Sequence, residues 1–253
     1  MSLLNVVFLG PAGSGKTTLT ATFGKWLEHE INYKVNYINL DPGCEFLPYK
    51  PDFDIRDVIT TRDIMHREKM GPNSAMIRAV ELMEMRIKDI ITNIANLRGE
   101  VCLIDTPGQM EIFVFHTAGP KIIRKLGDIG RTVNVFLLDS TLISKVSGLV
   151  VAQLMGIAVQ LLMEVPTVTV LSKIDKVKRK DMDRLILDTE YLKKILKEES
   201  RGTITDLSLE ISEVIEILRG VSRVVKVSAT KNIGFDHLYD LIHEIFCTCG
   251  DLT

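Results

Sequence analysis

Short apolar runs alternate along this chain with longer segments in which apolar residues recur every three or four positions. The short runs are rich in Val, Ile and Leu, and they span residues 4–9, 34–40, 99–104, 132–138, 166–172 and 222–228. Strands of a parallel sheet have this composition when both faces of the sheet are covered. The pattern therefore predicts a buried strand at each of these places.

The longer segments predict helices between the strands. They cover residues 16–30, 74–97, 143–164, 183–198, 204–218 and 235–246. Within 74–97, for example, Met76, Val80, Met83 and Ile87 follow one another at helical spacing. Alternation of this kind predicts an α/β fold with a mostly parallel sheet flanked by helices.

We predict a single domain over residues 1–253, with helical insertions at about 41–98 and 176–220. The first insertion separates the second and third predicted strands by a long helix. Its length favours a parallel crossover between those strands over a tight hairpin. The second insertion adds a charged helical pair.

Composition narrows the class of protein. The charges nearly cancel, with 31 basic and 33 acidic residues, and aromatic residues make up only 6%. A nucleic-acid partner is therefore not expected. Four cysteines are too few for a disulfide framework, and the N-terminus does not resemble a signal peptide, so we expect a cytoplasmic protein. The uncharged run 146–163 is interpreted as a buried or interface helix and not as a membrane span.

The strongest chemical signal lies between the first predicted strand and the first predicted helix. Residues 10–17 read GPAGSGKT, which fits the phosphate-binding pattern G-x-x-x-x-G-K-[ST]. Glycines let backbone N–H groups approach phosphate oxygens, and the following helix adds its positive N-terminal end. The predicted nucleotide-binding residues here are Gly10, Gly13, Ser14, Gly15, Lys16, Thr17 and Thr18. Lys16 would reach the β- and γ-phosphates, and Thr17 would ligate Mg²⁺.

A second signal, Asp105-Thr106-Pro107-Gly108-Gln109, directly follows the third predicted strand. Asp105 is predicted to hold Mg²⁺, the Gly108 N–H to bond the γ-phosphate, and Gln109 to orient the attacking water.

Asp41 ends the second predicted strand. Its possible roles are the outer Mg²⁺ shell, acceptance of a proton from water, or only the turn of an Asp-Pro-Gly sequence.

Two further strand ends predict the recognition of guanine. Ser172-Lys173-Ile174-Asp175 is a variant of [NT]-K-x-D, in which the carboxylate accepts two hydrogen bonds from the guanine edge. Ser172 replaces the usual Asn. Ser228-Ala229 follows the last predicted strand and is similar to the S-A element that meets guanine O6. Lys173, Asp175, Ser228 and Ala229 are therefore the predicted base-binding residues.

The order of these motifs, together with Gly71-Pro72-Asn73 before the helix 74–97, resembles the GPN-loop GTPases over roughly residues 3–246. The resemblance implies a P-loop NTPase fold, Mg²⁺-dependent hydrolysis of GTP to GDP, and a homodimer in which Asn73 acts at the partner's phosphate site. It also implies protein partners such as RNA polymerase assembly components, and no membrane. As an ordinary turn, the same tripeptide would make Asn73 a helix N-cap.

Two other functions use overlapping motifs. The first is a nucleotide-dependent switch or scaffold with negligible turnover. The second is a P-loop kinase, which the two guanine-reading elements disfavour. A zinc site built from His243, Cys247 and Cys249 has only three ligands and is weakly supported.

Overall fold

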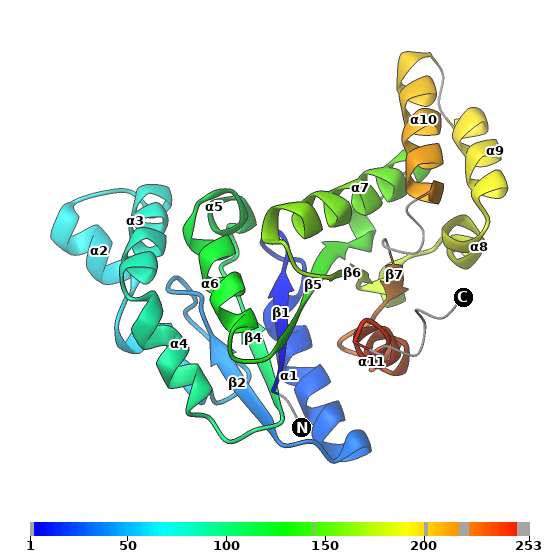
Figure 1. Ribbon diagram of the computed structural model, residues 1–253. Helices are drawn as coiled ribbons and strands as arrows, with labels where there is room; N and C mark the ends of the chain where they lie inside the picture. The colour runs from blue at the N-terminus through cyan, green and yellow to red at the C-terminus, as the bar shows by residue number, and fades with distance from the viewer. Residues whose placement is uncertain (1–2, 144, 200–201, 218–222, 247–253) are drawn as a thin grey trace.

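The computed structural model describes residues 3–143, 145–199, 202–217 and 223–246. Seven parallel strands form one sheet in the order β3-β2-β4-β1-β5-β6-β7 (Figure 1). The strands are β1 (Leu4–Leu9), β2 (Val35–Asn39), β3 (Phe53–Asp54), β4 (Val101–Asp105), β5 (Arg131–Asp139), β6 (Thr167–Ser172) and β7 (Arg223–Lys226). The predicted α/β fold with a parallel sheet is confirmed.

Helices cover both faces of the sheet. They are α1 (Lys16–Trp26), α2 (Thr61–Glu68), α3 (Pro72–Met85), α4 (Ile87–Ala95), α5 (Met110–Phe115), α6 (Ala118–Gly127), α7 (Val146–Met163), α8 (Met182–Leu187), α9 (Thr189–Glu199), α10 (Thr203–Ile217) and α11 (Phe235–Glu244). Side chains alternate between the faces of a strand. In β1, Val7 and Leu9 therefore pack under α3, α4 and α6, whereas Val6 and Phe8 pack under α1 and α11.

The predicted helix over 74–97 is wrong in one respect, because it consists of two helices. Arg86, with φ −104° and ψ 17°, interrupts the helix between α3 and α4. The buried residues Met83 and Ile90 lie one on each side of the break at continuous helical spacing. Hydrophobic periodicity therefore cannot reveal the interruption.

The segment 176–220 also differs from expectation. Its described residues form three helices, α8, α9 and α10, in place of a helical pair, and the break at Asp188 divides the predicted helix 183–198. The Asp188 carboxylate accepts a hydrogen bond from the Tyr191 N–H, which stabilises the start of α9. In Figure 1 these three helices lie beyond α7, at the β7 side of the sheet.

One described helix, α7, is long and apolar enough to cross a membrane by length and composition alone. It packs against β5 and β6 of the sheet and against α9 and α10. Gly156 lies so close to Thr169 of β6 that a larger residue would collide with the threonine hydroxyl. This close packing is typical of a core helix of a folded domain. Such core helices can also be long and apolar enough to cross a membrane.

Candidate nucleotide site

The sequence motifs all follow the carboxyl ends of strands. The glycine-rich loop follows β1, Asp41 follows β2, Asp105 ends β4, and Ser172 ends β6. Because the strands are parallel, these ends lie along one edge of the sheet, where open α/β sheets bind ligands. In Figure 1, α3 begins on the same side of the sheet.

The loop of residues 10–15 needs glycine for conformation and for space. Gly10, Gly13 and Gly15 all have positive φ angles, of 149°, 76° and 97°. A Cβ on Gly10 would collide with the carbonyl oxygen of Leu137 in β5. Helix α1 begins directly after Gly15, so its first N–H groups face the loop.

Lys16 is held inside the glycine-rich loop. Its side chain is buried, and Nζ donates hydrogen bonds to the carbonyl oxygens of Gly10 at 2.7 Å and Pro11 at 3.1 Å. Burial lowers the pKa of Lys16, while the negative charges of Asp105 and Asp41 act in the opposite direction. The ammonium group is thus placed where a phosphate oxygen could replace a loop carbonyl as its partner.

Asp105 is a buried carboxylate that is only partly satisfied. The Tyr49 hydroxyl donates to Asp105 Oδ2 at 3.3 Å, whereas Oδ1 has no hydrogen-bond partner among the described residues. Burial raises the pKa of Asp105 to about 6, although Thr17 and Lys16 both favour the ionised form. An unpartnered buried carboxylate oxygen beside a threonine hydroxyl is a donor set that suits Mg²⁺, which prefers oxygen ligands. The predicted metal ligands, Thr17 and Asp105, therefore fit this ion.

Asp41 both shapes its own turn and reaches the loop after β4. Its Oδ1 accepts from the Gly43 N–H at 2.8 Å, and its Oδ2 accepts from the Gly108 N–H at 3.3 Å. Burial raises the pKa of Asp41, and these two hydrogen bonds oppose the rise. Asn39 fixes the backbone here, because its amide contacts both the N–H and the C=O of Asp41. Asp41 therefore forms the expected turn, and its carboxylate also contacts the loop that carries Gly108.

Residues at the ends of β6 and β7 are linked to one another and to the glycine-rich loop. The Ser172 hydroxyl donates to the carbonyl oxygen of Ser14 at 2.7 Å. Lys173, at φ 58°, forms an ion pair with Asp139 at 2.6 Å. The Ser228 hydroxyl donates to Asp175 Oδ1 at 2.5 Å. Serine in place of the usual Asn therefore still links this motif to the loop.

A cavity opens between these groups. Residues of the loop and of α1 form one wall, and residues after β6 and β7 form the other; the lining includes Ser14, Gly15, Thr18, Lys173, Asp175 and Ala229. Asp175 is exposed, so its carboxylate is accessible to a ligand. Residues predicted to bind the phosphates and residues predicted to bind the base thus line the same cavity.

Two predicted residues stand apart from this network. Asn73 is exposed on the first turn of α3, and Gln109 is half-buried just before α5. No side-chain hydrogen bond links either of them to another described residue. Asn73 is not the N-cap of α3, because Gly71 occupies that position and Pro72 begins the helix.

The structure adds residues that sequence reasoning missed. Tyr49 contacts Asp105, and Asp139 pairs with Lys173. Asp139 ends a strand as Asp105 does, and this position at a strand end could have identified Asp139 from the sequence. Tyr49 lies in the turn-rich segment after β2, and no sequence pattern marks it.

The weakly supported zinc site cannot be placed, because Cys247 and Cys249 lie outside the described residues. His243 is described, and its Nε2 lies 3.5 Å from the Tyr33 hydroxyl. Within the described ranges, no group of three or more His, Cys, Asp or Glu side chains could hold a metal ion.

Comparisons with known proteins show what this chain is similar to. A family model described as a conserved hypothetical ATP binding protein matches residues 8–248. The GPN-loop GTPase PAB0955 of Pyrococcus abyssi is 36% identical, over 98% of this chain and 99% of that protein. GPN-loop GTPase 3 of Dictyostelium discoideum is 32% identical, over 80% of this chain and 69% of its own length. The crystal structure of PAB0955, a GTPase in apo form, superposes with a TM-score of 0.87 at 33% identity, covering 97% of this chain and 98% of that one.

Proposed function

The chain belongs to the GPN-loop GTPase family, and we propose that it binds GTP with Mg²⁺ and hydrolyses it to GDP and phosphate as a homodimer. One observation carries this proposal: the cavity lined by Ser14 and Gly15 on one side is lined by Asp175 and Ala229 on the other. A phosphate-binding loop and a carboxylate that can read the guanine edge therefore face the same ligand.

The choice of GTP over ATP rests on Asp175. An exposed carboxylate in the base cavity, held by Ser228, can accept hydrogen bonds from guanine N1–H and N2–H₂. Adenine offers no such pair of donors on that edge. The family model carries a description that mentions ATP, so nucleotide preference is the first property to measure.

Residues at the carboxyl ends of the strands would bind the phosphates and take part in hydrolysis. Lys16 would contact the β- and γ-phosphates, and Thr17 and Asp105 would hold Mg²⁺, which supplies positive charge for the leaving diphosphate. Asp41 would accept a proton from the attacking water or hold water in the outer metal shell. Gln109 would orient that water. For Gly108 to bond the γ-phosphate, its N–H must exchange its present partner, Asp41.

Two exposed features support the proposed homodimer and the proposed role of Asn73. Asn73 lies in solvent at the start of α3, where the first N–H groups of the helix can meet an anion. Beside the glycine-rich loop, an apolar groove is lined by Pro11, Ala12, Leu142, Val151 and Met155, and Leu142 is 79% exposed. Apolar surface next to the nucleotide supports a two-fold contact that brings Asn73 to the partner's phosphates.

Single-turnover hydrolysis tests the proposal. Purified protein mixed with a substoichiometric amount of [γ-³²P]GTP and Mg²⁺ should release phosphate, and EDTA should stop the release. A Lys16→Ala variant is the negative control, and Gln109→Ala should bind GTP normally but hydrolyse it slowly. If GTP binds tightly while phosphate release is no faster than in buffer, the protein is a switch or scaffold without turnover.

The biological setting is proposed from the family and from composition. Cys44 and Cys102, the two cysteines within the described residues, are free thiols, which supports a reducing cytoplasm. Family resemblance assigns the output to protein partners such as RNA polymerase assembly components. Co-purification in the presence of GTP or GDP would test that assignment.

A further inference from the structure

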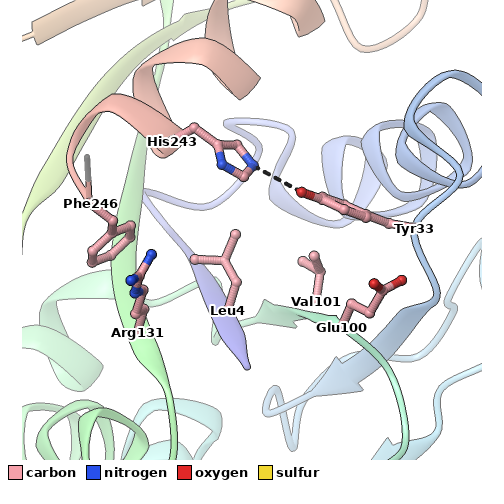
Figure 2. A pocket seen from close by; sticks show the side chains of 7 residues that line it. All are labelled: Leu4, Tyr33, Glu100, Val101, Arg131, His243 and Phe246. Atoms are coloured by element: carbon pink, nitrogen blue, oxygen red, sulfur yellow. Dashed lines mark hydrogen bonds between the residues drawn. The ribbon is translucent and has the colours of Figure 1, made fainter. Parts of the chain in front are cut away.

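A second cavity lies at the opposite edge of the sheet from the nucleotide site. Its floor is formed by Leu4, Val101 and Arg131, which are paired neighbours at the beginnings of β1, β4 and β5. Tyr33 and the end of α11 form its walls, with His243 and Phe246 (Figure 2). The cavity measures about 340 Å³, within the range of sites that hold small organic molecules.

Arg131 supplies a positive charge to this cavity. Its guanidinium carbon lies 5.7 Å from the centroid of the Phe246 ring, a contact that orients the planar group. Its backbone N–H donates to the carbonyl oxygen of Leu3, but among the described residues its guanidinium group forms neither a hydrogen bond nor an ion pair. By contrast, Arg223 at the beginning of β7 is paired with Glu244 of α11. Arg131 therefore retains its full capacity to bind a planar anion in a bidentate manner.

The opposite wall offers hydroxyl and imidazole groups that are only weakly engaged. The Tyr33 hydroxyl lies 3.5 Å from His243 Nε2 and 3.4 Å from the Tyr239 hydroxyl, and both distances are long for hydrogen bonds. Burial lowers the pKa of His243, with Asp240 acting against the shift and Arg131 with it, so the surroundings favour the neutral ring. These groups can still bond a ligand oxygen.

Glu100 lines the same cavity and accepts a hydrogen bond from the Lys34 N–H through one oxygen. Its negative charge disfavours polyanions such as nucleoside triphosphates. With the Arg131 cation, the Glu100 carboxylate and the apolar side chains of Leu4 and Val101, the cavity is complementary to a molecule that carries a single negative charge on an apolar body.

We propose that this cavity is a binding site for a small apolar monocarboxylate, whose carboxylate pairs with Arg131 and whose apolar body lies on Leu4, Val101 and Phe246. The site shares no lining residue with the nucleotide cavity. The inference is therefore independent of the proposed GTPase activity.

Titration with 3-phenylpropionate, followed by proton NMR, tests the proposal. The chain has five histidines, and the Cε1–H resonance of His243 can be assigned with a His243→Gln variant. The resonance should shift saturably in the parent protein. Binding should weaken by about tenfold or more in Arg131→Gln, because a charge-assisted bond is lost. Arg67→Gln, which changes an exposed arginine of α2, is the matched control and should bind as the parent does.

Two further ligands test whether the cavity requires a single negative charge on its ligand. The neutral amide 3-phenylpropionamide should bind much more weakly than the acid, and phenyl phosphate should bind no tighter than the acid. Unchanged affinity for GTP in Arg131→Gln would show that the variant is folded. The proposal is overturned if the His243 resonance does not move, if Arg131→Gln binds the acid as well as the parent does, or if phenyl phosphate binds tighter.

Discussion

Asp41 and Gly108 are joined by a hydrogen bond of 3.3 Å from the Gly108 N–H to the Asp41 carboxylate. The bond connects the turn after β2 with the loop after β4, two segments that are separated by 67 positions in the chain. The N–H that we assign to the γ-phosphate is thus occupied by a carboxylate, and nucleotide binding must compete with this contact. The two residues form a unit whose function can be tested.

Asp41→Asn should slow GTP hydrolysis by about 10²-fold or more, since general-base catalysis contributes about 10²–10⁴. Affinity for GTP should change little, because the amide oxygen can still accept from the Gly43 N–H and preserve the turn. Single-turnover rates and fluorescence titration with a GTP analogue measure the two effects. Hydrolysis at the parental rate would leave Asp41 with a role in the turn alone.

Asp105→Asn should stabilise the metal-free protein at pH 7.5. Burial raises the pKa of Asp105 to about 6 from an ordinary 3.8, so the folded state binds this proton more tightly than the unfolded state does. The parent therefore loses stability as the pH rises from about 4 to about 6, by about 3 kcal/mol if this group acts alone. In urea denaturation, the free energy of unfolding of Asp105→Asn should exceed that of the parent at pH 7.5 but not at pH 4.

Magnesium provides the complementary measurement. Mg²⁺ with GDP should raise the melting temperature of the parent more than that of Asp105→Asn, because the variant lacks the carboxylate that holds the ion. An equal shift in both proteins would contradict the assignment of Asp105 as a metal ligand.

Lys16→Ala should weaken GTP binding by about 10- to 150-fold, which corresponds to the 1.5–3 kcal/mol of a hydrogen bond to a charged group. Lys25→Ala is the matched control, since Lys25 is an exposed lysine in the last turn of the same helix. Isothermal titration calorimetry with a non-hydrolysable GTP analogue gives both affinities. Equal losses in the two variants would point to a general effect of charge and not to a phosphate contact.

Asp175→Asn should abolish the preference for guanine and shift it toward xanthine nucleotides. A site built on hydrogen bonds to the base can discriminate by about 10⁴-fold, and the parent should prefer GTP to ATP to a comparable degree. Ser228→Ala removes the 2.5 Å hydrogen bond that orients Asp175, so it should reduce the preference without reversing it. Competition titrations with GTP, XTP and ATP measure these preferences. Similar affinities of the parent protein for GTP and ATP would refute the assignment of Asp175 as the residue that selects guanine.

Asn73→Ala should retain GTP binding and dimerisation but lose much of the hydrolysis. The loss should be smaller than the roughly 10³–10⁵ of an arginine finger, because Asn73 is neutral. A mixed dimer of one Asn73→Ala subunit and one Lys16→Ala subunit separates the two geometries. If Asn73 acts on the partner, the competent site faces an intact Asn73, and about half of the parental activity survives. If it acts within its own chain, the mixed dimer is as slow as the Asn73→Ala homodimer.

Much of this site follows from sequence alone. The motifs at Gly10–Thr17, Asp105–Gln109, Ser172–Asp175 and Ser228–Ala229 each adjoin a short apolar run. Parallel strands place all such ends at one edge of the sheet, so recognising the strands is sufficient to bring the motifs together. The spacing between the second and third predicted strands likewise indicated the parallel crossover, and β2 does pair with β4 in parallel.

Other features were decided by tertiary structure. The contact of Asp41 with Gly108, of Tyr49 with Asp105 and of Arg131 with Phe246 each joins residues far apart in the chain, and none has a local pattern. The hydrophobic pattern of the sequence also does not reveal the helix break at Arg86, because the buried positions keep helical spacing across it. Periodicity records which face of an element is buried. It does not record which side chains on different elements meet, because that depends on strand register and on how helices and loops pack together.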